Sequence, residues 1–123
     1  MKLRIVSIPK SQKEPLANIY RNGTLSLNRA MFDALELKND KEYHVSLALD
    51  DKNGPDKKLY LVFQKETDRS SRKLIITTKS CTVNFTRTFD ELGLDYKKNE
   101  FQYYLEKLDS WEGRRVVVLA RKQ

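Results

Sequence analysis

The residues able to do nucleophilic, acid–base or metal-binding chemistry are few in this chain. The single histidine, His44, falls on the solvent-facing phase of an expected strand, and we interpret it as a surface residue. The single cysteine, Cys81, has no histidine near it in sequence and is interpreted as a small turn or strand residue. Asp50 and Asp51 flank an expected turn, where Asp is favoured because it accepts backbone N–H groups. We therefore expect no catalytic residue, no metal, no cofactor and no enzymatic activity.

The charge of the chain points to another kind of chemistry. It has 24 Lys and Arg residues against 17 Asp and Glu residues, a net charge of +7. Residues 1–66 carry +3 and residues 67–123 carry +4, so the positive charge belongs to both halves and not to a basic tail. The physical partner of a small basic surface is a polyanion such as nucleic acid.

Length and composition indicate a single domain spanning residues 1–123. Apolar residues make up 39% of the chain, enough to form a core, and a lone cysteine excludes an internal disulfide. The N-terminus lacks the apolar run of a secretion signal, and no stretch approaches a membrane span. We expect a cytoplasmic protein without membrane contact.

The chain contains an internal repeat. Residues 23–37 align with residues 81–94 with one deletion: Thr24 and Arg29 match Thr82 and Arg87 at a spacing of 58, and Phe32 matches Phe89 at 57. Residues 43–47 align with 101–105, and residues 61–65 with 118–122. These matches define repeat one (16–65), a polar linker (66–72) and repeat two (73–122). The alternative is chance similarity between two strand-helix-strand stretches.

Each repeat is expected to have the order strand, strand, helix, strand, strand. In repeat one, alternating residues surround an Asn22-Gly23 turn, Asn28 caps a short helix ending at Leu37, and residues 43–49 and 59–63 form a hairpin. In repeat two, the corresponding elements are residues 74–78 and 83–85, a Thr86-capped helix through Leu94, and residues 100–108 and 116–120. Leu3–Ile8 reads as a further strand that adds to the sheet at an edge.

This order of elements resembles the AbrB/MazE-like swapped-hairpin family of bacterial DNA-binding proteins. The segment from Arg21 to Val45 follows the family's pattern of turn, strand, capped helix and Leu-x-Leu triplet closely, and Lys79 to Tyr103 follows it less well. The family's usual proline before the helix is replaced by Asn28 and Thr86. The resemblance implies a mostly β fold with two short helices, a pseudo-twofold swapped-hairpin β-barrel made from two ββαββ-like repeats. It also implies that one chain replaces the usual homodimer.

The resemblance further implies where nucleic acid would bind. In the family, cations at the turn before the helix and at its first residue point toward DNA. Here these positions give the predicted nucleic-acid-binding residues Arg21, Asn22 and Arg29 in repeat one and Lys79, Ser80 and Arg87 in repeat two. Lys2, Arg4, Arg72 and Lys73 would add charge that strengthens attachment, and Thr82 would add a hydrogen-bonding group. The alternative for each is a solvated sheet residue.

Three hypotheses of function follow. The first is a double-stranded DNA binder acting as a transcriptional regulator or antitoxin-like repressor, either a monomeric pseudo-dimer or a homodimer. The second is a non-enzymatic β-barrel module that binds a protein partner and whose charge is incidental. The third is a single-stranded nucleic-acid binder that stacks bases on exposed tyrosines, although alternation places several of the rings in the core.

Overall fold

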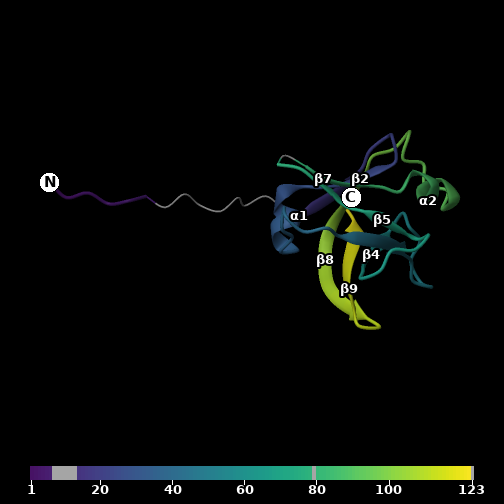
Figure 1. Ribbon diagram of the computed structural model, residues 1–123. Coiled ribbons are helices and arrows are strands. Elements are labelled where there is room, and N and C mark those ends of the chain that lie inside the picture. Colours follow the sequence, from purple (N-terminus) through teal and green to yellow (C-terminus); the bar gives the residue numbers. More distant parts are fainter. Residues whose placement is uncertain (7–13, 79, 123) are drawn as a thin grey trace.

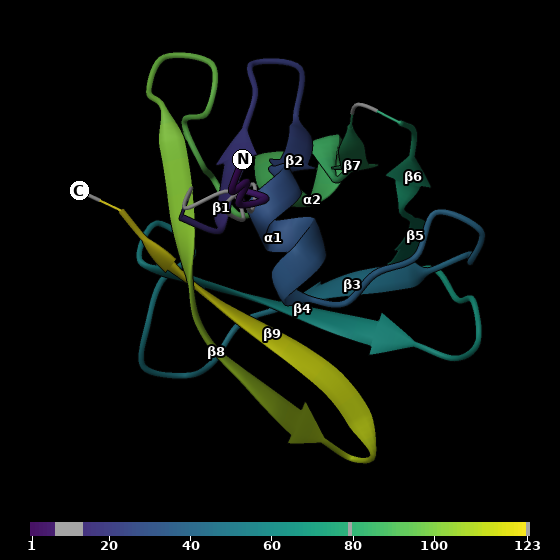
Figure 2. The ribbon, with the colours of Figure 1, turned by 90° about the vertical axis from the view of Figure 1, so that its left-hand side faces the viewer.

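The computed structural model describes residues 1–6, 14–78 and 80–122 (Figure 1). Within these residues the strands form one nine-stranded antiparallel sheet, in the order β5-β3-β4-β9-β8-β1-β2-β7-β6. The sheet curls into a nearly closed barrel, with two short helices as its other regular elements (Figure 2). The mostly β fold with two short helices is confirmed.

The two halves of the chain supply the elements in the same order. The first half supplies β1 (Leu16–Ile19), β2 (Thr24–Leu27), α1 (Arg29–Ala34), β3 (His44–Ala48) and β4 (Lys58–Gln64). The second half supplies β5 (Ser71–Lys73), β6 (Ile75–Ile76), β7 (Cys81–Asn84), α2 (Thr86–Glu91), β8 (Phe101–Trp111) and β9 (Arg114–Arg121). Only Leu74 separates β5 from β6, so these two strands stand where the first half has β1 alone.

The backbone pairing also corresponds between the halves. In β3–β5 the pairs are His44↔Lys73, Val45↔Arg72 and Ser46↔Ser71. In β8–β1 they are Gln102↔Asn18, Tyr103↔Ala17 and Tyr104↔Leu16. In all three pairs, the residue of β8 lies 58 positions after its counterpart in β3, and the residue of β5 lies 55 positions after its counterpart in β1. The same two spacings relate the first hairpin of each half. Ile75 pairs with Thr82 in β6–β7, and their counterparts 55 and 58 positions earlier, Tyr20 and Thr24, are joined by a hydrogen bond from Tyr20 N to Thr24 O.

Two further ladders join the halves to each other. Leu25 of β2 pairs with Val83 of β7, and Tyr60 of β4 pairs with Val118 of β9; the members of each pair are 58 residues apart. The hairpin registers match Leu61 with Leu119, one residue beyond the alignment expected from the sequence. This one-residue difference could not be predicted from the sequence. The run Val116–Ala120 in β9 is apolar at every position, so it lacks the alternation of apolar and polar residues that would fix its alignment with β4.

The helices close the barrel. Met31 and Leu35 in and after α1, and Phe89 of α2, are fully buried in one core with the inward residues of the strands. α1 lies over one opening of the barrel and α2 over the other (Figures 1 and 2). Asn28 caps α1 as predicted, its Oδ1 accepting from Met31 N at 2.8 Å.

Two local predictions are wrong. α2 begins at Thr86 itself, with Phe85 at the N-cap and no side-chain cap, because the Thr86 hydroxyl donates to Asn22 O and Asn84 Oδ1 instead. Both helices also end three residues earlier than predicted, since Glu36 and Gly93 adopt positive φ.

The expected strand Leu3–Ile8 is also wrong where it can be judged. Residues 1–6 have no strand and project away from the barrel (Figure 1), and residues 7 and 8 lie outside the described residues. Alternation of apolar and basic residues gives a segment the burial pattern of a strand, but the pattern alone supplies no backbone partner.

Gly23 generates a stability prediction. Its φ is +81°, and a Cβ placed there would lie 2.3 Å from Thr86 Oγ1 and 2.7 Å from Thr86 Cα. Gly93 has a φ of +73° and nothing within 4 Å of its Cβ position. We expect Gly23→Ala to lower the free energy of unfolding by about 2–4 kcal/mol, from strain plus overpacking, and Gly93→Ala by about 1–2 kcal/mol, from strain alone. Urea denaturation followed by circular dichroism measures both, and equal losses would show that the contact with Thr86 is unimportant.

Candidate nucleic-acid interface

The outer face of the β2–β7 ladder is polar and uncharged. Leu25, Leu27, Cys81 and Val83 point into the barrel core, so the alternate residues of both strands point outward. These are Thr24 opposite Asn84 and Ser26 opposite Thr82. We call this face the β2–β7 platform; it presents hydroxyl and amide groups, which can donate or accept hydrogen bonds.

Acidic residues are absent from the segments that build this part of the barrel. None of the 17 Asp and Glu residues falls in residues 15–32 or 69–89, which contain seven Lys and Arg residues. These segments form β1, β2, β5, β6, β7 and the starts of both helices. The rest of the chain has equal numbers of basic and acidic residues, so the whole net charge of +7 belongs to these two segments. This local absence of acids is readable in the sequence, but comparing the charge of the two halves does not detect it.

At one end of the platform, the first turn of repeat one packs on the helix of repeat two. Thr86 Oγ1 donates to Asn22 O at 2.9 Å, which holds the start of α2 against the turn. Arg21 and Arg87 are both exposed, and neither forms an ion pair with a residue that the structure describes. A hollow of about 360 Å³ opens beside Arg87, and its polar lining residues are Arg72, Asn84, Thr86, Arg87 and Thr88.

At the other end, the first turn of repeat two lies beside the helix of repeat one. A smaller hollow of about 170 Å³ is lined by residues of both, including Arg29, Phe32 and Ser80. Arg29 is partly engaged, because its Nε lies 3.2 Å from Asp33 Oδ1 and its guanidinium lies over the ring of Phe32. Lys79, the cation predicted for this turn, lies outside the described residues.

The other predicted residues are placed as follows. Arg72 borders the hollow at the α2 end, where its Nη1 donates to Arg69 O and Ser71 O. Lys73 Nζ forms an ion pair with Glu42 Oε1 at 3.3 Å, so part of its charge is neutralised. Arg4 lies on the N-terminal segment and is not brought beside the others.

Arg29 and Arg87 do not occupy equivalent positions, contrary to the sequence alignment. Arg29 is the first residue of α1, whereas Arg87 is the second residue of α2. The one-residue deletion that separates the repeats therefore falls before the helix and not within it, so that Asn28 corresponds to Phe85. The outward residues Thr24, Ser26 and Asn84 were not among the predicted residues, although the polar phase of the two strands indicates them.

The residues considered for catalysis are held in structural contacts. His44 is half-buried, with its Nε2 3.4 Å from Glu42 Oε1. Asp50 accepts hydrogen bonds from Tyr60 and Asn53, which lower the pKa of its carboxyl and, for Tyr60, raise the phenol pKa to about 12. In the part of the chain that the structure describes, no group of three or more His, Cys, Asp or Glu side chains could hold a metal ion.

Comparisons of the chain with protein-family models, with curated proteins and with solved structures find no match. None of the helices among the described residues has the length and apolar character needed to cross a membrane.

Cys81 generates a prediction about reactivity. Its side chain is 3% exposed within the core, and burial raises the pKa of its thiol to about 11. Because the thiolate is the reactive form, its population near pH 8 falls by roughly two orders of magnitude relative to an ordinary cysteine. We expect iodoacetamide at pH 8 to label the native chain at least about 100-fold more slowly than the chain in 8 M urea. Mass spectrometry of timed samples measures this, and equal rates would show an accessible, activated thiol.

Proposed function

We propose that this protein binds double-stranded DNA through the β2–β7 platform and the cations at its two ends. The observation that carries the proposal is the coincidence of a polar, acid-free outer face with the whole net positive charge of the chain. In this proposal the protein is a transcriptional regulator or antitoxin-like repressor of the AbrB/MazE-like, swapped-hairpin type, and one chain forms the pseudo-twofold barrel that two chains form in that family.

The contacts between the halves support the swapped-hairpin architecture. The turn at Asn22 packs on α2, and the turn that ends at Ser80 lies beside Arg29 of α1, so each repeat's hairpin meets the other repeat's helix. The shared pairing registers and the 58-residue spacing of Leu25 and Val83 agree with two interleaved copies of one unit. A pseudo-dimer of this kind presents its binding groups twice along one face.

The dimensions of the platform suit a duplex. Four paired residues in each strand span about 13 Å, close to the roughly 12 Å width of the DNA major groove. Cations at both ends of such a span can reach phosphates on opposite sides of one groove, while the hydroxyl and amide groups between them face the base edges. Arg21 and Arg87, which have no ion-pair partner among the described residues, are the cations most available for these contacts.

The tyrosines favour a duplex over a single strand. Among the five tyrosines considered for base stacking, Tyr20 is exposed, Tyr103 is fully buried, and Tyr43, Tyr60 and Tyr104 are half-buried. Tyr60 and Tyr103 donate their hydroxyl groups to Asp50 and to Pro55 O. One open ring is a poor stacking platform for successive bases, so the single-strand hypothesis loses its main support.

The first binding prediction concerns the free arginines. We expect Arg21→Ala and Arg87→Ala each to weaken binding to a 30-base-pair duplex by about fivefold at 50 mM salt and to reduce the slope of log K against log salt by about 0.9. Lys73→Ala should have a smaller effect, because Glu42 already neutralises part of this charge. Arg114→Ala, which removes an arginine paired with Glu112 at the β8–β9 turn, is the matched control. Fluorescence anisotropy at 50 and 200 mM salt measures all four variants.

Three probes test the proposal itself: duplex DNA, single-stranded DNA and duplex RNA at the two salt concentrations. Tighter binding to duplex DNA that falls steeply with salt supports it. Absence of binding to duplex DNA at low salt ends the proposal, and tighter binding to the single strand replaces it with the third hypothesis.

The second binding prediction places a carboxylate on the platform. Ser26→Asp introduces a negative charge in the middle of the acid-free face, and a phosphate brought close to it would be repelled. We expect at least about a tenfold loss of duplex affinity, equal to about 1.4 kcal/mol, with a thermal unfolding midpoint that rules out misfolding. Ser110→Asp, at an exposed position of β8, changes the net charge equally and should leave most of the affinity intact. Equal losses for both variants would mean that only net charge matters.

A further inference from the structure

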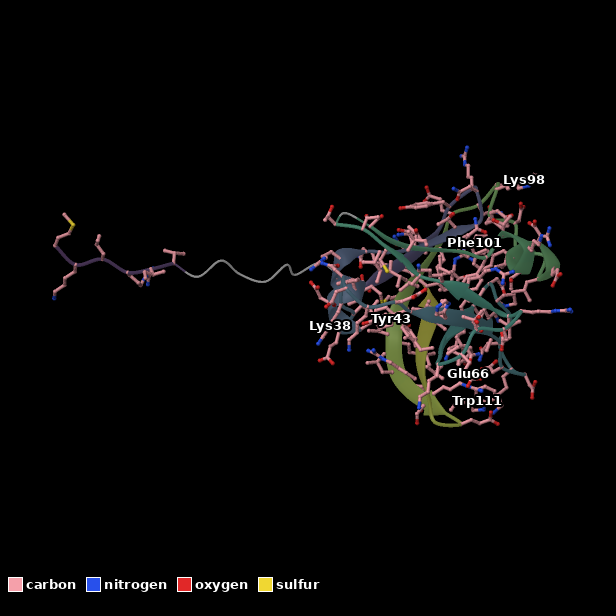
Figure 3. The ribbon with its side chains drawn as sticks, viewed as in Figure 1. Lys38, Tyr43, Glu66, Lys98, Phe101 and Trp111 are labelled. Carbon is pink, nitrogen blue, oxygen red and sulfur yellow. The ribbon has the colours of Figure 1, made fainter. Side chains whose placement is uncertain are left out.

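A second surface feature lies on the opposite side of the barrel from the β2–β7 platform. It is a pocket of about 350 Å³ over the outer face of the β4–β9 ladder, with apolar walls formed by Leu49, Tyr60, Val62, Trp111, Val116 and Val118. We call it the hairpin pocket, because the long β8–β9 hairpin forms one of its sides. Figure 2 shows β4 and β9 across the barrel from β2 and β7, and Figure 3 shows Trp111 at the end of the molecule far from Phe101.

The pocket is apolar where the outer face of a sheet is normally polar. Val117 and Leu119 of β9 point into the barrel core, while Val116 and Val118 form a separate cluster with Val62 on the other face, each at most 5% exposed. Strands that are apolar on both faces ordinarily have a covering element on each. Here Ala48 and Tyr60 pack against the cluster, and the pocket opens between Leu49 and Trp111, which are 40% and 54% exposed.

The wall formed by β8–β9 is not needed to close the barrel. β8 has eleven residues, whereas its counterpart β3 has five, so the second hairpin extends beyond the first. The extension carries Trp111, the single tryptophan of the chain, and it breaks the correspondence between the two halves. Trp111 is 54% exposed, and the Arg114 guanidinium lies over its ring. A partly exposed aromatic side chain beside an apolar pocket is typical of a binding surface.

The charged residues around the pocket indicate the chemistry that an occupant needs. Asp50 and Asp109 line it, and none of its lining residues is Lys, Arg or His. Asp109 Oδ2 lies 3.6 Å from Lys107 Nζ, which neutralises part of its charge, whereas Asp50 has no ion-pair partner among the described residues. An occupant therefore needs apolar side chains for the floor and cations for the rim.

The N-terminal segment has this chemistry, and its apolar side chains are not buried against the other residues that the structure describes. Met1, Leu3, Ile5 and Val6 are each at least 75% exposed, and Lys2 and Arg4 lie between them. Asn28 bonds to Leu16 N and Glu14 O, so the chain enters β1 beside the start of α1. The segment projects on that side of the barrel, away from the end of the β8–β9 hairpin where Trp111 lies (Figures 1 and 3).

We propose that the hairpin pocket binds the N-terminal segment, Met1–Val6, of a second copy of this chain. Leu3 and Ile5, which share one face of an extended segment, pack against Trp111 and the valines, and Lys2 and Arg4 reach Asp50 and Asp109 at the rim. Because segment and pocket are different surfaces, the contact is heterologous, and it leaves the β2–β7 platform exposed. The proposal therefore does not depend on DNA binding.

Sedimentation equilibrium of the full chain between 1 and 200 μM at low salt tests the assembly, these concentrations being chosen for the roughly micromolar range of weak association. We expect the average mass of the unchanged chain to rise with concentration and that of the Leu3→Ser/Ile5→Ser chain to remain monomeric. Asp109→Lys should weaken association by about tenfold, because it reverses a rim charge. Glu91→Lys, an equal charge change at an exposed position at the end of α2, should leave association unchanged.

Trp111 fluorescence tests the pocket directly. A peptide of residues Met1–Val6, added to the full-length Leu3→Ser/Ile5→Ser chain, should shift the Trp111 emission to shorter wavelength as the indole leaves water. The same peptide with Lys2→Glu and Arg4→Glu should bind at least about tenfold more weakly. Both results support the proposal.

Three results would overturn it. The first is a monomeric unchanged chain together with no effect of the peptide on Trp111. The second is an effect of the peptide on Trp111 while the unchanged chain stays monomeric at every concentration, which would assign the pocket to the chain's own segment. The third concerns a Lys2→Ser/Arg4→Ser chain: if its average mass equals that of the unchanged chain while its duplex affinity is lower, the N-terminal segment binds nucleic acid and not the pocket.

Discussion

The antiparallel pairing of β2 with β7 is the contact on which the arrangement of this molecule depends. It joins the first hairpins of the two halves at Leu25 and Val83, and its direction places the turn of each half beside the helix of the other. Gly23 is required at this junction, because the backbone of the turn passes so close to Thr86 that no Cβ fits between them. This ladder brings Asn22 into contact with Thr86, and these residues are the chain neighbours of Arg21 and Arg87.

The outer faces of the two ladders that join the halves differ in their chemistry. The outer residues of β2 and β7 are hydroxyl and amide side chains in an acid-free region, whereas those of β4 and β9 are valines beside two carboxylates. Both ladders bury apolar residues on the inside, and the outer valines of β4 and β9 form a second, smaller buried cluster. The difference agrees with the two proposals, a polyanion at one face and an apolar, basic segment at the other.

Local chemistry made much of the fold predictable, and contacts distant in sequence made the rest unpredictable. Asn28 was recognisable as a cap, and alternation located the hairpin strands, because both depend on neighbouring residues. Thr86 reads equally well as a cap, but its hydroxyl is used by Asn22, 64 residues away. The pairing of Lys73 with Glu42 likewise follows from the β3–β5 register, which hydropathy does not specify. The candidate cations were therefore identifiable by type, while their availability was not.

The two halves correspond in their backbone pairing but not in the contacts of their side chains. At the α2 end of the platform, Arg21 and Arg87 have no ion-pair partner among the described residues, and Arg72 borders a hollow of about 360 Å³. At the α1 end, Arg29 is engaged by Asp33 and Phe32 beside a hollow of about 170 Å³. The Arg29–Asp33 pair is exposed and therefore weak, but a phosphate must still compete with Asp33 for Arg29, whereas Arg21 and Arg87 need no such exchange. In the proposed complex the α2 end therefore holds the duplex more strongly.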